Sequence, residues 1–503
     1  MLFNTSINLE KLPHLNLILA FFFGGLAALG QAPWSMWGFT LLGFLGSFWL
    51  TGLDWKFRTA AILGFSTGLG YFTISLFWIV EPFLVDWEND GWIAPFALLT
   101  LSGGLSAFWA LAYGVSASMV ERRNGILSLI IFLTAAEICR TKLFTGFPWA
   151  LIGYVWTDHP ILQLAAFGGP HLLTFITLLI AGLPLLSRLK LIPRVISAVA
   201  ILMCCWIYGI VELGRNSNSY SNKFVRLIQP NASQNLKWDS TMIPIFWKRQ
   251  LELTGQPSVN ELDLIIWPET SIAVLLSDAD ILLKAISKAA LGKPVVLGAH
   301  DKVDGGVRNA MAVLGPDGEI LDVYHKQHLV PFGEYVPFGE ILSTFGIHGL
   351  AARDGSGFEV GTGERALDIS NIGRVLPLIC YELIFPRHLI SQVRPSVILQ
   401  ITNDAWFGST SGPYQHLHQA KARAVEQGIP LIRVANTGIS AVIDPWGNIV
   451  SQTKMNESAY LDVNIPGIRS ATFYSKFSDW PILMFIFLAI VFCVVSKIRR
   501  VNY

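Results

Sequence analysis

Long apolar runs recur along the first 215 residues of the chain, and each is close to the length that a membrane-spanning helix needs. A helix crosses the hydrocarbon core of a bilayer with about 20 predominantly apolar residues. Short polar breaks separate seven such runs, and an eighth, WPILMFIFLAIVFCVVSKIRR, begins at Trp480. The seven runs lie at about residues 13–30, 33–52, 59–80, 92–119, 125–143, 161–187 and 195–213. The pattern predicts a polytopic α-helical membrane domain over residues 1–215, with about eight transmembrane helices once residues 480–498 are added.

The fifth and first runs need separate interpretation. The fifth contains Glu137 and, near its end, Arg140, and ionisable groups within a membrane helix are costly. At a helix end such groups pair with each other or extend toward the water interface, so we expect one of these outcomes.

The first run follows Lys11 as in a signal peptide, but it lacks a convincing cleavage site and six more runs follow it. We therefore interpret the first run as a retained helix.

A different pattern fills the chain between Asn216 and Asp479, where charged residues are frequent and no apolar run reaches spanning length. Short β-branched runs alternate with helix-forming segments, and residues 315–318 and 445–447 mark two hairpin turns. We expect strands at residues 224–230, 262–270, 293–300, 309–326, 374–382, 396–404 and 429–453. We expect helices at residues 242–254, 276–290, 384–392 and 413–428. Alternating strands and helices with hairpins predict an α/β domain with a mixed sheet over residues 223–467.

Composition agrees with a protein that lies partly in a membrane. Hydrophobic residues make up 52% of the 503 residues and charged residues 14%. The mean hydropathy of +0.49 is high for a water-soluble chain of this length. The net charge of +1 comes without a basic stripe interleaved with aromatic residues, so nucleic-acid binding is not expected. Nothing in the sequence indicates an obligate oligomer, and we expect a monomer.

Positive charges in the loops predict how the chain crosses the membrane, because lysine and arginine are retained on the cytoplasmic side. They gather in alternate loops, at 56–58, 122–123 and 188–194, and again after the last run at 497–500. The intervening loop EPFLVDWENDGW carries acids and no base, whereas Arg140 and Lys142 are an exception in another loop. Both termini are therefore predicted to be cytoplasmic, and the α/β domain to be periplasmic.

Cysteine usage sets Cys380 apart. Cys139, Cys204, Cys205 and Cys493 fall in predicted spans, so Cys380 is the one thiol of the α/β domain and no disulfide can form within that domain. A single thiol in an oxidising compartment is a liability unless it is buried or used in chemistry. On this basis alone, a buried core thiol and a nucleophile remain equally open.

Polar residues follow several predicted strands, where α/β domains gather their ligand sites. Glu269 follows LIIWP, Cys380 follows RVLPLI, and Asn403 and Asp404 follow VILQIT. A thiol attacks as its thiolate and needs a base, which Glu269 could supply. The alternative is that Glu269 caps the helix that follows. A tetrahedral intermediate needs a donor for its oxyanion, which Lys326 could supply unless it is an ordinary solvated lysine.

Metal ligation is not indicated by the sequence. The two histidines His416 and His418 are two residues apart on a predicted helix, so their side chains point in different directions. That spacing favours packing or surface roles over a zinc site.

Three segments taken together resemble the Glu–Lys–Cys active site of the nitrilase superfamily, the carbon-nitrogen hydrolases. They are WPET at 267–270, HKQHLVPFGEYVPF at 325–338 and ICYELIFP at 379–386. With predicted spans on both sides of this domain, the whole chain resembles the membrane-embedded member of that group, the apolipoprotein N-acyltransferase family. The segment ITNDAWFG is also similar to that family. The resemblance implies a nitrilase-like αββα sandwich for the α/β domain.

The resemblance also implies roles for individual residues. Glu269 would be the general base, Lys326 the donor to the oxyanion and Cys380 the nucleophile. Further active-site positions of the family match Glu334, Tyr381, Glu382 and Asn309, and aromatic positions of its substrate region match Trp238 and Trp406.

The reaction that the resemblance implies is transfer of an acyl chain from a glycerophospholipid, typically phosphatidylethanolamine, to a bacterial lipoprotein. The acceptor would be the N-terminal amine of an S-diacylglyceryl cysteine. The implied mechanism is ping-pong, with the acyl chain held as a thioester on Cys380 after the lysophospholipid leaves. No cofactor or metal is implied, and the implied location is the bacterial inner membrane.

Two other functions remain open on the residues alone. A membrane-tethered amidase or nitrilase would hydrolyse a small C–N substrate through the same three residues, with water in place of the amine. A transporter or receptor would use the α/β domain only to bind a ligand, which Glu269, Lys326 and Cys380 at strand ends disfavour. The apolar and aromatic segment 329–350 is expected to form a lipid-facing lid, and the alternative is an ordinary packed loop.

Overall fold

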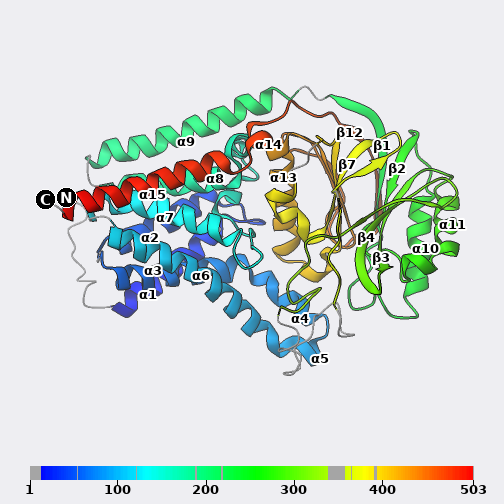
Figure 1. The fold of residues 1–503 in the computed structure, drawn as a ribbon, viewed down its shortest axis with the longest axis horizontal. Helices are drawn as coiled ribbons and strands as arrows, with labels where there is room; N and C mark the ends of the chain where they lie inside the picture. The colour runs from blue at the N-terminus through cyan, green and yellow to red at the C-terminus, as the bar shows by residue number, and fades with distance from the viewer. Residues whose placement is uncertain are drawn as a thin grey trace. The chain divides into compact units, whose positions relative to one another are not determined.

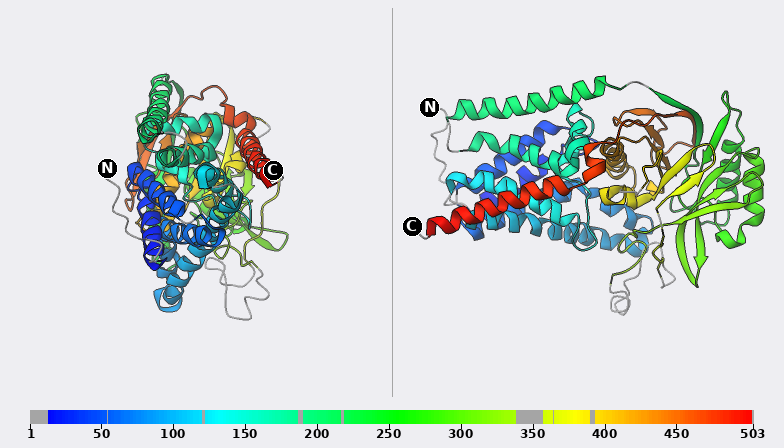
Figure 2. Two further views of the ribbon diagram at one scale, coloured as in Figure 1. Left: turned by 90° about the vertical axis from the view of Figure 1, so that its left-hand side faces the viewer. Right: turned by 45° about the horizontal axis from the view of Figure 1, so that its top comes forward.

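The computed structural model describes residues 13–53, 55–119, 122–186, 190–216, 219–337, 357–363, 365–389 and 393–501. The chain divides into two compact units. The first holds residues up to 215 and from 472 onward, except that residues 84–87 group with the second unit, which holds residues 216–471. The first unit is helical and the second combines helices with sheets (Figures 1 and 2).

Helices occupy every apolar run that the sequence predicts as a span. Their bounds are α1 (Pro13–Ala28), α2 (Trp37–Leu53), α3 (Phe57–Ser75), α6 (Ala94–Met119), α7 (Arg122–Arg140), α8 (Ala165–Gly182), α9 (Leu191–Gly214) and α15 (Trp480–Val501). Shorter helices of this unit are α4 (Glu81–Leu84), α5 (Trp87–Asp90) and α14 (Phe473–Phe477).

The number of these helices that can cross a membrane is smaller than predicted. In the part of the chain that the structure describes, four helical stretches are long and apolar enough, at 87–119, 160–185, 191–214 and 480–498. A fifth arises if the bent pair 57–75 and 77–84 counts as one span. Helices α1 and α2 have 16 and 17 residues and fall short of the usual spanning length. The prediction of about eight transmembrane helices is therefore not confirmed.

Glycines let helices α1 and α3 pack backbone against backbone. A Cβ atom added to Gly24 would lie 1.9 Å from the carbonyl oxygen of Thr67, and one added to Gly70 would lie 2.0 Å from that of Phe21. Small residues at such crossings allow the close approach that apolar helices use in place of hydrophobic burial.

The two ionisable residues of the fifth run pair with each other inside the helical unit. Arg140 Nε lies 2.6 Å from Glu137 Oε1, and both side chains are fully buried. Trp109 Nε1 donates to Glu137 Oε1 at 2.8 Å, and Arg140 Nη1 donates to the carbonyl oxygens of Phe147 and Trp149. Of the two expected outcomes, pairing is confirmed, and Arg140 also supplies donors to the loop that follows α7.

Two six-stranded sheets form the second unit. One has the order β12-β1-β2-β3-β4-β5 and the other β11-β10-β9-β8-β7-β6. The first consists of β1 (Tyr220–Gln229), β2 (Leu262–Ile266), β3 (Val295–Val303), β4 (Gly306–Leu314), β5 (Ile320–His325) and β12 (Ala459–Pro466). The second consists of β6 (Leu367–Ile369), β7 (Gly373–Ile379), β8 (Val397–Thr402), β9 (Leu431–Ala435), β10 (Ala441–Ile443) and β11 (Ile449–Gln452).

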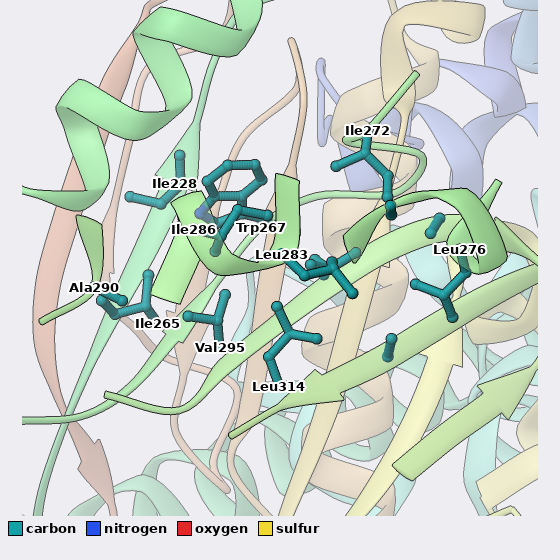
Figure 3. Close-up of a cluster of buried hydrophobic side chains, with 14 of the residues drawn as sticks. Ile228, Ile265, Trp267, Ile272, Leu276, Leu283, Ile286, Ala290, Val295 and Leu314 are labelled. Atoms are coloured by element: carbon teal, nitrogen blue, oxygen red, sulfur yellow. The ribbon is translucent and has the colours of Figure 1, made fainter. Parts of the chain in front are cut away.

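Helices cover the outer faces of both sheets. On one side α10 (Ile243–Thr254) and α11 (Asp280–Ala289) pack on the first sheet through a core that includes Trp267, Leu283 and Ile286 (Figure 3). On the other side α13 (Gly412–Gln427) packs on the second sheet through Leu417, Leu376 and other apolar residues. Strands of the two sheets contact each other between these layers. The predicted αββα sandwich is confirmed for the second unit (Figure 1).

The sequence predicted most of these elements but missed some of them. Both predicted hairpins join antiparallel neighbours, β4 with β5 and β10 with β11, whereas the short strand β6 and the strand β12 were not predicted. The helix predicted at 384–392 is wrong over its described residues, where η8 (Cys380–Ile384) and η9 (Pro386–Leu389) are single 3₁₀ turns. Pro386 lacks the N–H that a continuous helix would need there.

Candidate active site

Three strand ends bring the predicted catalytic residues into one region of the second unit. Lys326 follows β5 directly, Cys380 follows β7 directly, and Glu269 comes three residues after β2. Strands β2 and β5 belong to one sheet and β7 to the other. The site therefore lies where the two sheets of the sandwich face each other.

The Lys326 ammonium lies between two carboxylates. Its Nζ is 2.8 Å from Glu334 Oε1 and 3.7 Å from Glu269 Oε1. Asn309 Nδ2 donates to Glu269 Oε1 at 2.8 Å and to Glu334 Oε1 at 3.3 Å, and all four side chains are buried. Burial alone would lower the pKa of Lys326, but the charges of Glu334, Glu269 and Cys380 outweigh burial and raise it. Lys326 is therefore a fixed positive charge in a site largely closed to water.

Glu269 receives donors from both sheets. Its Oε1 faces Asn309 of β4 and Lys326, while its Oε2 accepts the backbone N–H of Asn403, at the end of β8, at 2.8 Å. Each of these neighbours is a donor, which suits an acceptor-only carboxylate. The carboxylate thus links the two sheets at the centre of the site.

Cys380 sits on a strained turn at the end of β7. Its φ is +51°, in the left-handed region, which costs an L residue about 1–2 kcal/mol. The side chain is buried, and burial raises the pKa of the thiol; Glu269 adds to the rise and Lys326 opposes it. The resting group is a thiol, so attack requires a base to take the proton as the bond to sulfur forms.

Glu382 ties the segment that carries the lysine to the turn that carries the cysteine. Its Oε1 accepts from the Tyr324 hydroxyl and from the backbone N–H of Gln327, both at 2.8 Å. Its Oε2 accepts the backbone N–H of Ile379 at 2.8 Å, and Arg365 Nη1 lies 2.9 Å from Oε1. The carboxylate is fully buried, so its role is to hold these two segments together.

A cavity of about 330 Å³ opens beside Glu269. Trp238 lines it with its side chain about half exposed, and its ring lies 6.3 Å from that of His300. Lys237 Nζ donates to the backbone oxygen of Glu269 at 3.3 Å, and desolvation lowers the pKa of Lys237 to about 8. The other walls are mostly apolar and include Ile243, Phe246, Trp247, Ile272, Val274 and Leu282. The structure therefore brings Trp238 to the same site as Glu269.

The remaining two predicted residues, Tyr381 and Trp406, do not line this cavity. Tyr381, next to the cysteine, is buried, with its ring 5.1 Å from that of Phe385 and 5.7 Å from that of His328. Trp406 lies partly exposed in η10 (Asp404–Phe407) and is not among the residues that line the cavity beside Glu269.

The sequence assigned no role to several residues of the site. Asn403, expected only as one of the polar residues that follow a strand, holds Glu269 through its main chain. Gln400 and Arg433 were not expected at the site and are polar residues inside the strands VILQIT and LIRVA. These strands are buried along their whole length, so a polar side chain within them is a signal that the sequence already carries.

The predicted lid lies mostly outside the described residues. Of residues 329–350, only 329–337 are described. At the beginning of this segment the backbone N–H of Val330 donates to Glu334 Oε2 at 2.9 Å. Glu334 therefore also holds the start of the segment that follows Lys326.

The arrangement can carry out nucleophilic chemistry at a carbonyl. It combines a buried thiol, a carboxylate that can accept its proton and an ammonium that can stabilise an oxyanion. Within the described ranges no group of three or more His, Cys, Asp or Glu side chains is placed to hold a metal ion.

Comparison with known proteins covers nearly the whole chain. The family described as apolipoprotein N-acyltransferase N-terminal domain matches residues 23–183, and the carbon-nitrogen hydrolase family matches residues 225–472. The apolipoprotein N-acyltransferase of Rhodopseudomonas palustris is 34% identical, over 95% of this chain and 95% of its own length. That of Caulobacter vibrioides is also 34% identical, over 96% of this chain and 94% of its own length.

Solved structures match the second unit. A CN-hydrolase superfamily protein from Xanthomonas campestris is 20% identical, with a TM-score of 0.36, over 52% of this chain and 96% of its own. Identity above 30% with the two relatives extends across both the helical and the α/β units. The chain belongs to the apolipoprotein N-acyltransferase family.

Proposed function

We propose that this protein transfers an acyl chain from a glycerophospholipid to the N-terminal amine of the S-diacylglyceryl cysteine of bacterial lipoproteins. Family membership supports the reaction, and one structural observation carries the assignment to residues. The buried Lys326 ammonium lies against Glu269 and Glu334, and the charges of Lys326 and Glu269 both act on the Cys380 thiol. Glu269 is the base, Lys326 the oxyanion donor and Cys380 the nucleophile.

The first half-reaction loads the enzyme with the acyl chain. Glu269 takes the thiol proton while the Cys380 sulfur attacks the ester carbonyl, and the negative oxygen that forms is stabilised by Lys326. Collapse of this intermediate breaks the C–O ester bond, and Glu269 returns the proton to the departing lysophospholipid oxygen. The products are a Cys380 thioester and a lysophospholipid.

The second half-reaction unloads the chain onto the lipoprotein. The acceptor amine attacks the thioester carbonyl, Lys326 again stabilises the oxyanion, and Glu269 takes a proton from the nitrogen. The C–S bond breaks and the sulfur regains that proton. The products are an N-acylated lipoprotein and the free thiol.

The proposed location follows from the chemistry of the substrates. Both are lipids anchored in a bilayer, and extracting an acyl chain into water costs about 0.8 kcal/mol per CH₂. We place residues 1–215 and 480–498 in the bacterial inner membrane and residues 223–467 in the periplasm as the catalytic domain, with both termini cytoplasmic. Phosphatidylethanolamine as donor and a monomeric enzyme are parts of the same proposal.

Family membership favours this function over the amidase alternative, which would use the same three residues with water as acceptor. The deciding experiment traps the covalent intermediate. Purified protein incubated with a phospholipid that carries a labelled acyl chain is expected to acquire label that hydroxylamine releases. Cys380→Ala should acquire none, because the sulfur that forms the thioester is missing.

The matched control is Cys139→Ala, which removes a thiol of α7 in the helical unit. It should label like the wild type. Label that persists in Cys380→Ala would exclude this residue as the nucleophile. Loss of label to water rather than to a diacylglyceryl peptide amine, with the peptide present, would favour hydrolysis over acyl transfer.

A further inference from the structure

A ring of four buried polar side chains lies behind Cys380 in the second sheet and its helix. Gln400 lies in β8, Arg433 in β9, Asp404 in η10 and His416 in α13. All four side chains are fully buried. Polar groups buried among apolar strands are costly unless their donors and acceptors are matched. The hydrogen bonds of these four side chains therefore indicate which other groups they fix in place.

Gln400 donates to the backbone carbonyl of Cys380, and His416 lies beside both groups. Gln400 Nε2 donates to Cys380 O at 3.1 Å and is also 3.0 Å from His416 Nε2. The carbonyl of the proposed nucleophile is thus bound by a side chain of the neighbouring strand, whose nitrogen in turn contacts His416 of α13.

The other two members set the direction of these bonds. Arg433 Nη1 donates to Gln400 Oε1 at 2.6 Å, which turns the amide nitrogen of Gln400 toward Cys380 and His416. Arg433 Nη2 pairs with Asp404 Oδ2, and Asp404 Oδ1 lies 3.0 Å from His416 Nδ1. A carboxylate only accepts, so His416 carries its proton on Nδ1 and accepts from Gln400 at Nε2.

The charges of the ring favour these protonation states. Burial opposes an ionised Asp404, but Arg433 and His416 outweigh it and hold the pKa of Asp404 at about 2. Burial, assisted by Arg433, lowers the pKa of His416, which keeps the imidazole neutral. An ionised Asp404 and a neutral His416 are the two states that the hydrogen-bond directions require.

Cys380 holds a left-handed backbone conformation, which persists only where the surroundings over-determine it. We propose that Gln400 and His416 are positioning residues for acyl transfer, an inference that rests on the proposed function. Gln400 binds the Cys380 carbonyl and so keeps the turn that presents the sulfur to Glu269 and Lys326, and His416 accepts from the same Gln400 nitrogen and holds it in place. Arg433 and Asp404 act one step further away, because they fix which end of the Gln400 amide donates and which nitrogen of His416 accepts.

The test replaces Gln400 by methionine, which has a similar length but cannot donate to the carbonyl. Gln400→Met is expected to slow formation of the labelled thioester by about 10- to 100-fold, the effect of misplacing a reacting atom by about 1 Å. The KM for phospholipid should not change, since these side chains are fully buried and do not line the cavity beside Glu269. A rise in KM with an unchanged rate would overturn the proposal.

Gln229→Met is the matched control for loss of a buried glutamine. Gln229 lies in β1 of the other sheet, is fully buried, and bonds to the backbone of Lys454 and Glu457 and to Ser440. It should lower the unfolding temperature in the same way as Gln400→Met but leave the acylation rate near that of the wild type. Equal loss of rate in both variants would show a general packing effect and overturn the proposal.

Variants of His416 keep the proposal testable if Gln400→Met does not fold. His416→Gln offers an amide oxygen that can still accept from Gln400 Nε2, so it should retain a larger acylation rate than His416→Ala. Equal rates in the two variants would contradict a hydrogen-bonding role.

Alkylation separates this inference from the proposed function. The rate at which iodoacetamide modifies Cys380, followed by mass spectrometry of its peptide, does not require any lipid substrate. Slower modification in Gln400→Met than in Gln229→Met supports positioning even if the wild type forms no thioester, whereas equal rates of modification overturn it.

Discussion

At the residue scale, the candidate active site has two carboxylates next to one ammonium group. Glu269 and Glu334 both lie against Lys326, and Asn309 donates from one amide nitrogen to both carboxylates. The amide of Asn309 therefore supplies a hydrogen-bond donor to each carboxylate and helps to hold Glu269, the proposed base, in place.

Replacing this amide by a third carboxylate tests this arrangement. Asn309→Asp is expected to slow thioester formation at neutral pH by about 100-fold, because it replaces the donor to Glu269 and Glu334 by an acceptor and adds a third carboxylate beside Lys326. The measurement is the rate of thioester formation.

The control for this substitution is Asn464→Asp in β12, which makes the same chemical change in a strand at the edge of the first sheet. It should leave the rate of thioester formation near that of the wild type. A rate for Asn309→Asp that matches that of the control would refute the role given to Asn309.

At the scale of elements, buried charged side chains connect segments of the chain that follow different helices and strands. Glu382 joins the segment after β5 to the turn after β7, and Arg140 joins the end of α7 to the carbonyl groups of the following loop. Ion pairs made by such side chains are costly to break because one partner remains as an uncompensated buried charge. Their contribution is best measured by removing the partners singly and together.

The pair in α7 offers such a double-mutant cycle. Arg140→Met is expected to lower the free energy of unfolding by about 3–5 kcal/mol, because it leaves the Glu137 side chain buried without its partner. The double variant Glu137→Gln/Arg140→Met should be less destabilised than Arg140→Met alone. Denaturant unfolding of the detergent-solubilised protein measures each value. Strict additivity of the two single changes would contradict a direct pairing energy.

At the scale of the whole molecule, the α/β unit contains partly buried histidines whose pKa values lie far below the usual range. Desolvation lowers the pKa of His300 and His328 to about 4 and that of His388 to about 2, with nearby cations adding to each shift. In the unfolded chain each of these groups binds a proton near pH 6.5. Between these values the unfolded state therefore binds more protons than the folded state.

This difference predicts how stability depends on pH. The folded pKa values are depressed, so the stability they contribute is present above about pH 6.5 and is lost as the pH falls toward 4. Thermal unfolding of the solubilised protein should shift to lower temperature over this interval. His388→Asn should reduce the slope, because it removes one of the groups that bind protons on unfolding. An unchanged slope in this variant would contradict the assignment.

Sequence alone was enough for the features that depend on local order. Runs of apolar residues marked the positions of the long helices, and alternation with turn residues marked most strands and both hairpins. Glu269, Lys326 and Cys380 were predicted to lie together because each follows a strand in a recognisable segment, and the structure places them in one region. The number of helices that span a membrane was not settled in this way, because α1 and α2 are shorter than the apolar runs around them suggested.

Only the tertiary structure decided how these residues act on one another. The backbone of Asn403 binds Glu269 across 134 positions of the chain, and Glu382 holds main-chain groups more than 50 residues away. His416, expected to pack or lie at the surface, is buried beside the Cys380 carbonyl. Local patterns carry the period of helices and strands, whereas hydrogen-bond partners depend on which strands and helices meet. Long-range strand pairing and packing determine which elements come into contact, and a local stretch of sequence does not specify them.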